Sequence, residues 1–449
     1  MSSILGDVIT ISGWVLLALW AVMMAHGLIV FLLSRRIKPA LREPSSNMAF
    51  VFLVPCMNEE RVIGATVQSL LAFDQGRWAG AVGVVIIDDD SSDGTADVLA
   101  EFADDPRVYV LRRRAPNAQL GKGHALNAAY RWLLRSPWNA GRAELVVAII
   151  DADGRLEPSA LDRVAPYLAD PAVAGVQIGV KIRNAPEHLL ARFQDVEFGL
   201  FTDVIQTGRN RLSSPSLGGN GQFTRLDALQ DLGAEPWSSC LTEDLEVGLR
   251  LILEGHELRH CPTTWVDQQG LTSVSRWIRQ RTRWFQGHLQ CRGYIIDLWR
   301  SDLPFRVKAD LAYHLAGPVL MLVTSLAVVI GWIAMAAQLI VEPAGTLAGL
   351  SSPQGALAYA IAFTPCPVVA LVLWRREPEM GFLRGLTIAH LYLVYCGLWF
   401  ISGWKGVVRT VRGQGAWAKT DRLMESAHPE PWLDAAAPVS AAARQAEAA

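Results

Sequence analysis

Acidic side chains gather in two short segments that each follow an apolar run, Asp88-Asp89-Asp90 and Asp151-Ala152-Asp153. A continuous apolar run of this kind is typical of a buried parallel strand. Carboxylates that converge beyond buried strands repel one another unless a cation or hydrogen-bond donors compensate their charge. A pair of aspartates around one residue suits a hard divalent ion, Mg²⁺ or Mn²⁺, which takes oxygen ligands and commonly bridges a diphosphate. The two segments therefore predict a metal-assisted diphosphate site.

Two further segments add groups that could act on a substrate. Thr242-Glu243-Asp244 opens an apolar helical pattern, so these residues fit a helix cap. A carboxylate in an acid-rich, partly closed pocket can also have its pKa raised towards the working pH, which would make Asp244 a general base. In the segment Gln280-Arg281-Thr282-Arg283-Trp284, Arg283 could hold a leaving diphosphate and Trp284 offers a flat face for a sugar. A membrane-surface helix or a protein contact would explain this basic aromatic segment as well.

Strand-like and helix-like segments alternate between residues 49 and 150. The predicted strands are the apolar runs 49–54, 82–87, 107–111 and 145–150. Asn58 is expected to cap a helix that opens with Glu59, and 121–135 reads as a loop and a helix. This βαβ series predicts an α/β domain with a mostly parallel sheet and helices on both faces. Ligands of such sheets bind beyond the carboxyl ends of the strands, where both acidic segments lie.

The composition excludes several other classes of protein. The chain is 51% hydrophobic and 19% charged, and its formal net charge is −2, which argues against a strongly basic nucleic-acid binder. Its six cysteines include no C-x-x-C pair, which argues against a zinc ribbon or a disulfide-built scaffold. The sequence also lacks the glycine-rich motifs of dinucleotide and P-loop sites.

Long apolar stretches at both ends of the chain predict membrane helices. Residues 9–33 form one transmembrane helix, and basic residues follow it directly, which places the domain at 35–302 in the cytoplasm. The region 303–404 holds two or three further spans within 311–341, 356–374 and 383–404. Three crossings would export the basic tail at 405–433, so we expect one stretch to lie in the interface or to be re-entrant. Residues 434–449 are expected to be a disordered tail.

Six motifs occur in one order and together resemble a known family. They are N-E-E at 58–60, D-D-D-S-S-D-G-T at 88–95, G-K-G-H-A-L-N at 121–127, D-A-D at 151–153, T-E-D at 242–244 and Q-R-T-R-W at 280–284. This order resembles the membrane-bound, inverting family-two glycosyltransferases, such as cellulose, chitin, hyaluronan and poly-N-acetylglucosamine synthases. The resemblance implies a GT-A fold over about 49–290 and a nucleotide-diphosphate sugar as donor, most often a UDP-sugar.

The resemblance also implies a role for each matching residue. For donor binding they are Asp88, Asp89, Glu59, Lys122 and Asp151; for the metal, Mg²⁺ or Mn²⁺, they are Asp153 and Asp151. Asp244 would take the proton from the acceptor hydroxyl, with Glu243 beside it, and Arg283 would stabilise the departing diphosphate. Gln280 and Trp284 would border the acceptor.

Further segments bear on this resemblance. The pattern at 187–212 predicts a helix with one apolar face, which either packs in the core or docks the domain on the bilayer. Trp417-Ala418-Lys419-Thr420 resembles a loop that closes over the nucleotide in related synthases. Asp90 replaces the glycine usual in the family, and the G-G-N-G-Q segment at 218–222 has no clear counterpart.

The expected function is transfer of a sugar to a growing β-linked polysaccharide at the inner face of the cell membrane. Two alternatives stay open: transfer of one sugar to a lipid acceptor, and a membrane-anchored sensor that has lost activity. The expected partners are the nucleotide sugar, a saccharide or lipid acceptor and the bilayer, with an oligomer or an accessory export subunit left open. The sequence does not fix the donor sugar or the linkage.

Overall fold

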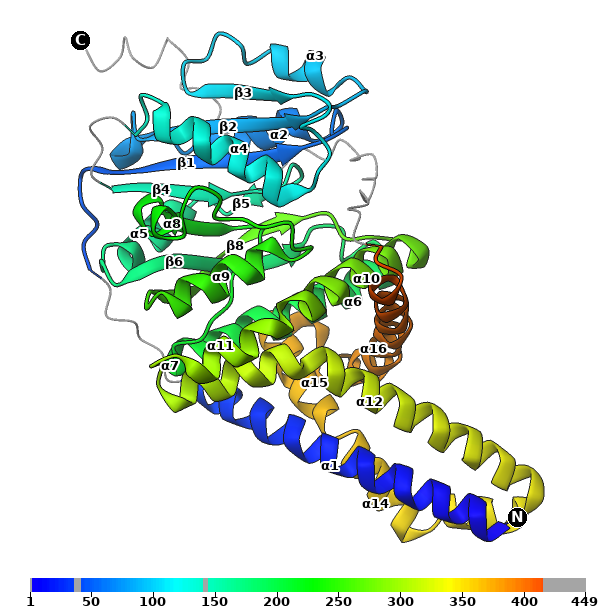
Figure 1. The fold of residues 1–449 in the computed structure, drawn as a ribbon. Coiled ribbons are helices and arrows are strands. Elements are labelled where there is room, and N and C mark those ends of the chain that lie inside the picture. Colours follow the sequence, from blue (N-terminus) through cyan, green and yellow to red (C-terminus); the bar gives the residue numbers. More distant parts are fainter. Residues whose placement is uncertain (1, 36–41, 140–143, 415–449) are drawn as a thin grey trace.

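The computed structural model describes residues 2–35, 42–139 and 144–414, and its centre is one eight-stranded sheet (Figure 1). The strands stand in the order β3-β2-β1-β4-β7-β6-β8-β5. Their bounds are β1 Met48–Cys56, β2 Val82–Asp89, β3 Val108–Arg113, β4 Glu144–Ile149, β5 Arg155–Leu156, β6 Val173–Ile182, β7 Gln222–Arg225 and β8 Glu257–Gln268. The α/β class is confirmed.

The sheet is parallel in its first half and mixed in its second. Strands β3, β2, β1 and β4 run parallel, as the uninterrupted apolar runs predict, and the central residues of β2, β1 and β4 are buried, whereas the edge strand β3 is partly exposed. Strand β7 runs antiparallel to both β4 and β6, while β6 and β8 are parallel. Cys56 of β1 pairs with Asp88 of β2, so the acidic segment after β2 leaves the sheet beside the end of β1.

Helices cover both faces of the sheet, as predicted. Two apolar cores lie on opposite sides of β1, because its alternate residues Phe50 and Phe52 belong to one core and Val51 and Leu53 to the other. The covering helices are α2 Ile63–Leu71, α3 Thr95–Ala100, α4 Lys122–Arg135, α5 Ala160–Leu168, α8 Leu226–Asp231 and α9 Glu243–Leu253, with a short 3₁₀ turn at Gly76–Trp78.

The helix expected to open at Glu59 is a wrong prediction. Helix α2 begins at Ile63, and Asn58 has a left-handed backbone (φ 56°). Its side-chain oxygen accepts a hydrogen bond from the Ser92 amide at 2.7 Å. Asn58 therefore ties two loops together instead of capping a helix.

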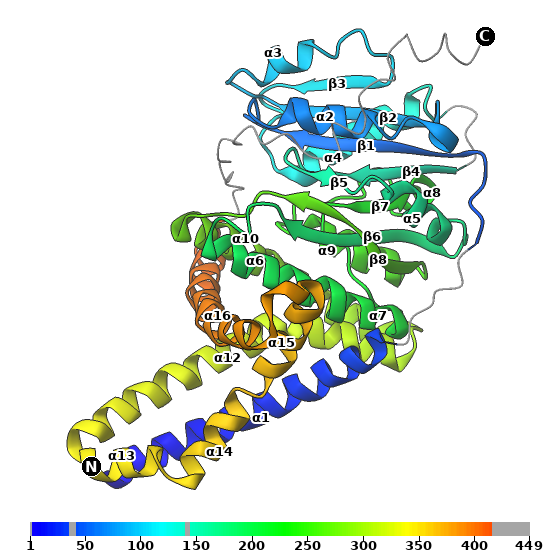
Figure 2. The ribbon, with the colours of Figure 1, turned by 180° about the vertical axis from the view of Figure 1, so that it is seen from behind.

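A layer of helices lies between the sheet domain and the apolar helices (Figure 2). These are α6 Leu189–Gly199, α7 Thr207–Leu212, α10 Val274–Gln290 and α11 Tyr294–Arg300, with a 3₁₀ turn at Cys291–Gly293. The helix predicted at 187–212 runs without a break from Leu189 to Leu212, and a π-helical segment at Leu200–Gln206 joins α6 to α7.

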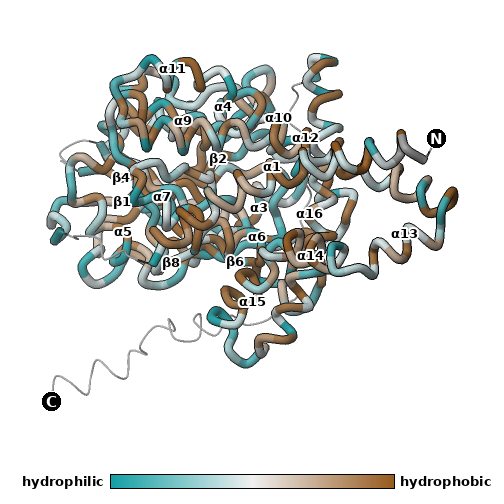
Figure 3. The backbone as a smooth tube through the Cα atoms, turned by 90° about the horizontal axis from the view of Figure 1, so that it is seen from below, coloured by the Kyte–Doolittle hydropathy of each residue, from teal (hydrophilic) through white to brown (hydrophobic). Residues whose placement is uncertain are grey.

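Among the described residues, three helices are long and apolar enough to cross a membrane: α1 Ser2–Ser34, α12 Phe305–Val341 and α16 Phe382–Val411. Pro318 does not interrupt α12. Helix α13 Pro343–Leu350 and a 3₁₀ turn at Pro378–Met380 flank a bent pair, α14 Pro353–Ala362 and α15 Pro365–Arg376, which meet at 43°. Figure 3 shows α1 and α12 extending away from the sheet towards the N-terminus and α13.

A buried polar cluster fastens α1 and α12 to the sheet domain. The Asp310 carboxylate of α12 lies 2.9 Å from His26 Nε2 of α1 and 2.7 Å from Arg209 Nε of α7. The Ser214 hydroxyl donates to the same carboxylate at 2.7 Å. Arg209 is 1% exposed, so its charge depends on Asp310 for compensation. The apolar helices are thereby held in a defined position relative to the sheet.

Candidate active site

The N-E-E and D-D-D-S-S-D-G-T motifs lie next to each other beyond β1 and β2, and hydrogen bonds join them. The Asn58 amide donates to Ser91 Oγ at 2.9 Å, and the Glu59 amide donates to Thr95 Oγ1 at 2.8 Å. The Gly94 amide donates in turn to Glu60 Oε2 at 2.8 Å. The hydroxyls and carboxylates of the D-D-D-S-S-D-G-T segment thus organise the N-E-E loop, which the spacing of the two motifs does not reveal.

Asp88 and Asp89 are buried at this edge and point to different partners. Asp88 is fully buried, and its Oδ1 accepts a hydrogen bond from the Ser91 amide at 3.0 Å. Asp89 Oδ1 lies 2.5 Å from Arg113 Nη1 of β3. Burial raises the pKa of Asp89, and the Arg113 charge opposes that rise. Asp89 and Arg113 therefore form a compact ion pair in the part of the site nearest β3.

A cavity of about 480 Å³ opens between the sheet edge and the apolar helices. Seven of the predicted site residues line it: Lys122, Asp151, Glu243, Asp244, Gln280, Arg283 and Trp284. Glu59, Asp88, Asp89 and Asp153 lie at or near the same sheet edge but are outside the lining of this cavity. The structure thus brings together residues separated by more than 160 positions.

Lys122 is the cation at the centre of the acidic group. Its Nζ lies 2.6 Å from Asp151 Oδ1 and 4.0 Å from Glu243 Oε1. Burial lowers the pKa of Lys122, but the charges of Asp151 and Glu243 outweigh it, and the net pKa is raised. Lys122 therefore stays positively charged and compensates the carboxylates from β4 and α9.

Glu243 and Asp244 occupy the first turn of α9, where the helix dipole favours negative charge. Burial nevertheless raises the pKa of Glu243 to about 7, with the Asp244 charge as the second cause. Burial also raises the pKa of Asp244. Burial thus favours the protonated form of both carboxyl groups, and a carboxylate with a raised pKa suits proton transfer.

The Gly218–Asn220 turn was not assigned a role from the sequence, and it forms one wall of the cavity. Gly219 has φ +75°, and a Cβ there would lie 2.8 Å from Asp244 Oδ2. Glycine is therefore required at 219 both by the backbone and by the space beside Asp244. The Gly218 amide donates to Gln177 Oε1 at 2.8 Å, which anchors the turn to β6.

Helix α10 presents Gln280, Arg283 and Trp284 to the cavity, and a buried arginine supports them. Arg281 is fully buried, lies 2.7 Å from Glu197 Oε2 of α6 and packs 3.9 Å from the Trp284 ring centroid. Glu197 also accepts a hydrogen bond from the Trp399 indole of α16 at 3.1 Å. In this motif Arg283 and Trp284 therefore face the cavity, whereas Arg281 supports them from the buried side.

The cavity includes residues that sequence analysis missed because they lie on the apolar helices or the layer beneath them. They are Glu197, Phe201, His288, His314, Pro318 and Met321. No local motif marks these positions, since each belongs to an apolar or amphipathic helical pattern. The packing of α6 and the π-helical segment against α10 and α12 brings them to the carboxylates.

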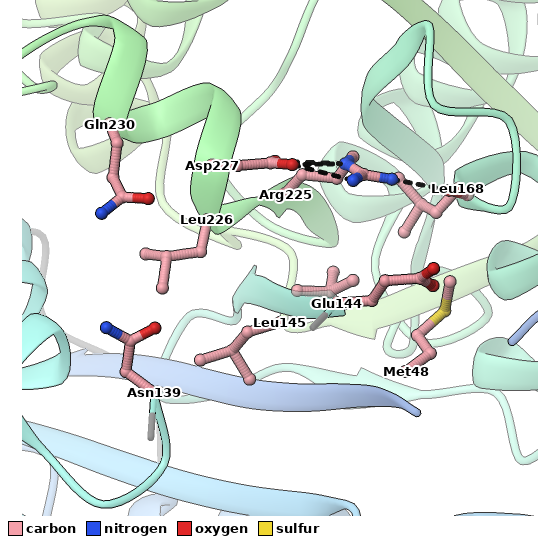
Figure 4. Close-up of a pocket in the computed structure, with 10 residues that line it drawn as sticks. Met48, Asn139, Glu144, Leu145, Leu168, Arg225, Leu226, Asp227 and Gln230 are labelled. Atoms are coloured by element: carbon pink, nitrogen blue, oxygen red, sulfur yellow. Dashed lines mark hydrogen bonds and ion pairs between the residues drawn. The ribbon is translucent and has the colours of Figure 1, made fainter. Parts of the chain in front are cut away.

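A second, smaller hollow lies near the opposite ends of the strands and lacks the features of a reaction site. It is lined by the first residues of β1 and β4 and by Arg225, Asp227 and Gln230 (Figure 4). The Arg225 guanidinium donates to Asp227 at 2.8 Å and to the Leu168 carbonyl at 3.3 Å. Its cation is therefore compensated, and the hollow lies away from the edge where ligands of α/β sheets bind.

A family model described as "Glycosyltransferase like family 2" matches residues 47–287, which is more than half of the chain. The chain belongs to this family. The match begins one residue before β1 and ends within α10, so it contains every site residue predicted from the sequence.

Curated relatives of this glycosyltransferase include both glycolipid and polysaccharide enzymes. It is 32% identical to a β-monoglucosyldiacylglycerol synthase of Trichormus variabilis over 65% of this chain and 59% of that protein. It is 26% identical to a poly-β-1,6-N-acetyl-D-glucosamine synthase of Staphylococcus epidermidis over 53% of each. The chain thus spans between half and three fifths of these relatives.

A solved structure with a similar fold covers nearly the whole glycosyltransferase. A mannosyltransferase of Pyrobaculum calidifontis, solved in complex with GDP-Man and Mn²⁺, superposes with a TM-score of 0.58 at 18% identity. The match covers 90% of this chain and 99% of that chain, which extends the shared fold beyond the sheet domain.

The carboxylates of the D-A-D segment fit a divalent cation only in part. Asp151 is held by Lys122, and Asp153 is fully buried with its Oδ2 accepting the Gln269 amide at 3.1 Å. Within residues 2–35, 42–139 and 144–414, no group of three or more His, Cys, Asp or Glu side chains could hold a metal. The hard oxygen donors of the glycosyltransferase suit Mg²⁺ or Mn²⁺, provided that a bound diphosphate supplies the remaining ligands.

Proposed function

We propose that this glycosyltransferase transfers one sugar from a nucleotide-diphosphate donor to a hydroxyl group of a membrane lipid, with inversion at the anomeric carbon. One observation carries the proposal: the cavity that holds Glu243 and Asp244 continues to Pro318 and Met321 of the long apolar helix α12. An acceptor that reaches the carboxylates through this end approaches from the apolar helices. The relative from Trichormus variabilis, a synthase of a glucosyldiacylglycerol, supports the same assignment.

A polysaccharide synthase that exports its own product is the second candidate, and the relative from Staphylococcus epidermidis favours it. A chain of sugars needs an enclosed polar path through the membrane. The most apolar windows of α1, α12 and α16 are only 6%, 17% and 22% buried, so the described helices leave most of their apolar surface open. This arrangement suits contact with lipid better than a closed bundle around a channel.

The chemistry follows from the groups that line the cavity. Asp244 accepts the proton of the acceptor hydroxyl while that oxygen bonds to the anomeric carbon and the bond to the donor diphosphate breaks. The raised pKa of Asp244 makes it a stronger base than a solvated aspartate. Arg283 and Lys122 face the negative charge that develops on the departing diphosphate. A divalent ion held by Asp151 and Asp153 would supply further positive charge to the leaving group.

Donor and acceptor would occupy opposite ends of the site. Asp88, Asp89 and Glu59 lie at the sheet edge by β1 and β2, which leaves the nucleoside at that end. Gln280 and Trp284 line the cavity from α10 and would border the acceptor. This division requires the donor sugar to lie in the cavity beside Lys122 and the α9 carboxylates.

Contacts of α16 support a placement in the membrane that leaves both tails on one side. Arg376, the last residue of α15, lies 3.9 Å from Asp195 of α6, and Gln286 of α10 donates to the Gln414 carbonyl, just after α16, at 2.8 Å. The chain on both sides of α16 therefore contacts the layer beside the sheet domain, as the flanks of an interfacial helix would. With α1, α12 and the α14–α15 pair as spans, the sheet domain stays cytoplasmic. The W-A-K-T segment and the predicted tail at 434–449 lie outside the described residues.

A product assay tests the proposal. Membranes containing the protein are supplied with radiolabelled nucleotide sugars and diacylglycerol, and the products are separated into lipids and polymers. We expect one labelled glycolipid, and Asp244→Asn to abolish it while retaining nucleotide binding. Long labelled chains in place of a glycolipid would favour the second candidate, and full turnover by Asp244→Asn would remove the assigned base.

A further inference from the structure

Two histidines from different parts of the chain meet in the wall of the cavity. His288 lies on α10, in the helical layer beside the sheet domain, and His314 lies on the long apolar helix α12. Their Nε2 atoms are 3.4 Å apart, and both side chains line the cavity that contains the carboxylates. Neither belongs to the motifs that carry the family resemblance, and the proposed mechanism does not use them.

The two histidines lie where the lining of the cavity changes from polar to apolar residues. Along α10 the cavity residues run from Gln280 through Trp284 to His288, and along α12 they continue from His314 through Pro318 to Met321. At 1.5 Å per residue, His314 and Met321 are separated by about 10 Å along the helix axis. A lipid whose chains lie beside Met321 would therefore place its headgroup at the histidines and its reactive hydroxyl towards Asp244.

The charge of this wall favours an uncharged headgroup. Burial lowers the pKa of His288 to about 4, with the Arg209 charge as the second cause, so the ring is neutral at physiological pH. Arg209 is buried behind the wall and is compensated by Asp310 at 2.7 Å. Because the two Nε2 atoms lie within hydrogen-bond distance of each other, the neutral pair offers a ligand one N–H donor and one acceptor nitrogen, which match a hydroxyl or an ester oxygen. A phosphate dianion would require a cation that these groups do not supply.

We propose that His288 and His314 bind the polar headgroup of the acceptor lipid and select an uncharged, hydroxyl- or ester-bearing headgroup over one that carries a phosphate. This inference rests on the proposed lipid acceptor and adds the residues that recognise it. The rings orient the acceptor and take no proton in the reaction, so they are positioning residues.

The test compares His288→Ala and His314→Ala with wild-type protein in mixed micelles of diacylglycerol. The loss of one neutral hydrogen bond predicts a rise of about tenfold in the KM for diacylglycerol. The KM for the nucleotide sugar should stay unchanged, because the donor lies at the other end of the site. His288→Gln and His314→Gln, which keep a donor and an acceptor, should recover part of the loss. His390→Ala is the matched control, because His390 lies on α16 and bonds to Tyr359 away from the cavity.

Selection against phosphate is measured with phosphatidic acid as a competitor of diacylglycerol. It should inhibit the wild-type protein weakly, whereas His314→Arg should make it a strong inhibitor. Unchanged acceptor KM in both alanine variants, or strong inhibition of the wild-type protein, would overturn the inference. If the wild-type protein forms no glycolipid, the proposed function itself fails; if it does so with KM unmoved by the variants, only the histidine assignment fails.

Discussion

Replacing Glu243 by glutamine should stabilise the protein at alkaline pH while it impairs catalysis. Glu243 is 8% exposed, and burial followed by the Asp244 charge raises its pKa from 4.5 to about 7. A shift of this size corresponds to about 3 kcal/mol of free energy between the two protonation states. Because the pKa is higher in the folded protein, folding favours the protonated acid, and ionisation of Glu243 costs stability.

The pH window follows from these two values. Below about pH 4.5 Glu243 is protonated in both the folded and the unfolded states, so it contributes no pH-dependent term. Between 4.5 and about 7 only the unfolded state releases the proton, and the free energy of unfolding falls as pH rises. Above about pH 7, Glu243 is ionised in the folded state as well, and the full loss in the free energy of unfolding is present. Glutamine has similar shape and no charge, so the variant escapes this cost.

The assay is thermal unfolding of the detergent-solubilised protein at about pH 8 and about pH 5. A gain of about 3 kcal/mol predicts a rise in Tm of roughly 5 °C at the higher pH, and a rise of only about 1 °C at the lower pH. Glu235→Gln is the matched control, because Glu235 pairs with Arg131 on the surface and its loss should change stability by less than about 0.5 kcal/mol. An equal effect of Glu243→Gln at both pH values, or a loss of stability at pH 8, would refute the reasoning.

Three further predictions concern catalysis. Initial rates at limiting acceptor should rise between pH 5 and 8, because burial raises the pKa of the base Asp244 above its usual range and that of Glu243 to about 7, and the base must lose its proton to act; a flat profile over this range would contradict this. Gly219→Ala should lower kcat by at least about tenfold with nucleotide affinity retained, since the new methyl group displaces the Asp244 carboxylate; an unchanged kcat would remove the turn from the site. Chelation by EDTA should abolish transfer and Mn²⁺ or Mg²⁺ should restore it, with Asp153→Asn requiring a higher ion concentration; full activity in EDTA would exclude the metal.

The parallel half of the sheet could be predicted from the sequence because its strands are buried on both faces. The runs 49–54, 82–87 and 145–150 lie within or overlap β1, β2 and β4. The antiparallel strand β7 is four residues long and carries polar residues, among them Gln222 and Thr224, so no apolar pattern predicts it. The start of α2 was also missed, because the bond from Ser92 to Asn58 depends on a contact between loops.

The donor end of the site was more predictable than the acceptor end. Lys122, Asp151 and Asp244 stand in local motifs, and the structure brings all three to one cavity. His314 and Met321 lie in the apolar helix α12, whose hydrophobic pattern indicates only burial or contact with lipid. Their place in the cavity depends on the angle at which α12 crosses α10. That angle is set by tertiary contacts such as the His26–Asp310–Arg209 cluster, which local sequence does not encode.

The central claim is that the acceptor hydroxyl reaches the α9 carboxylates from the apolar helices. Photo-crosslinking with a diacylglycerol analogue that carries a diazirine beside the glycerol tests this most directly. We expect labelled peptides that contain His288 or the Gly317–Met321 turn, with labelling suppressed by unlabelled diacylglycerol. Labelling confined to outward residues such as Trp332, which is 76% exposed, with none in the cavity, would contradict it.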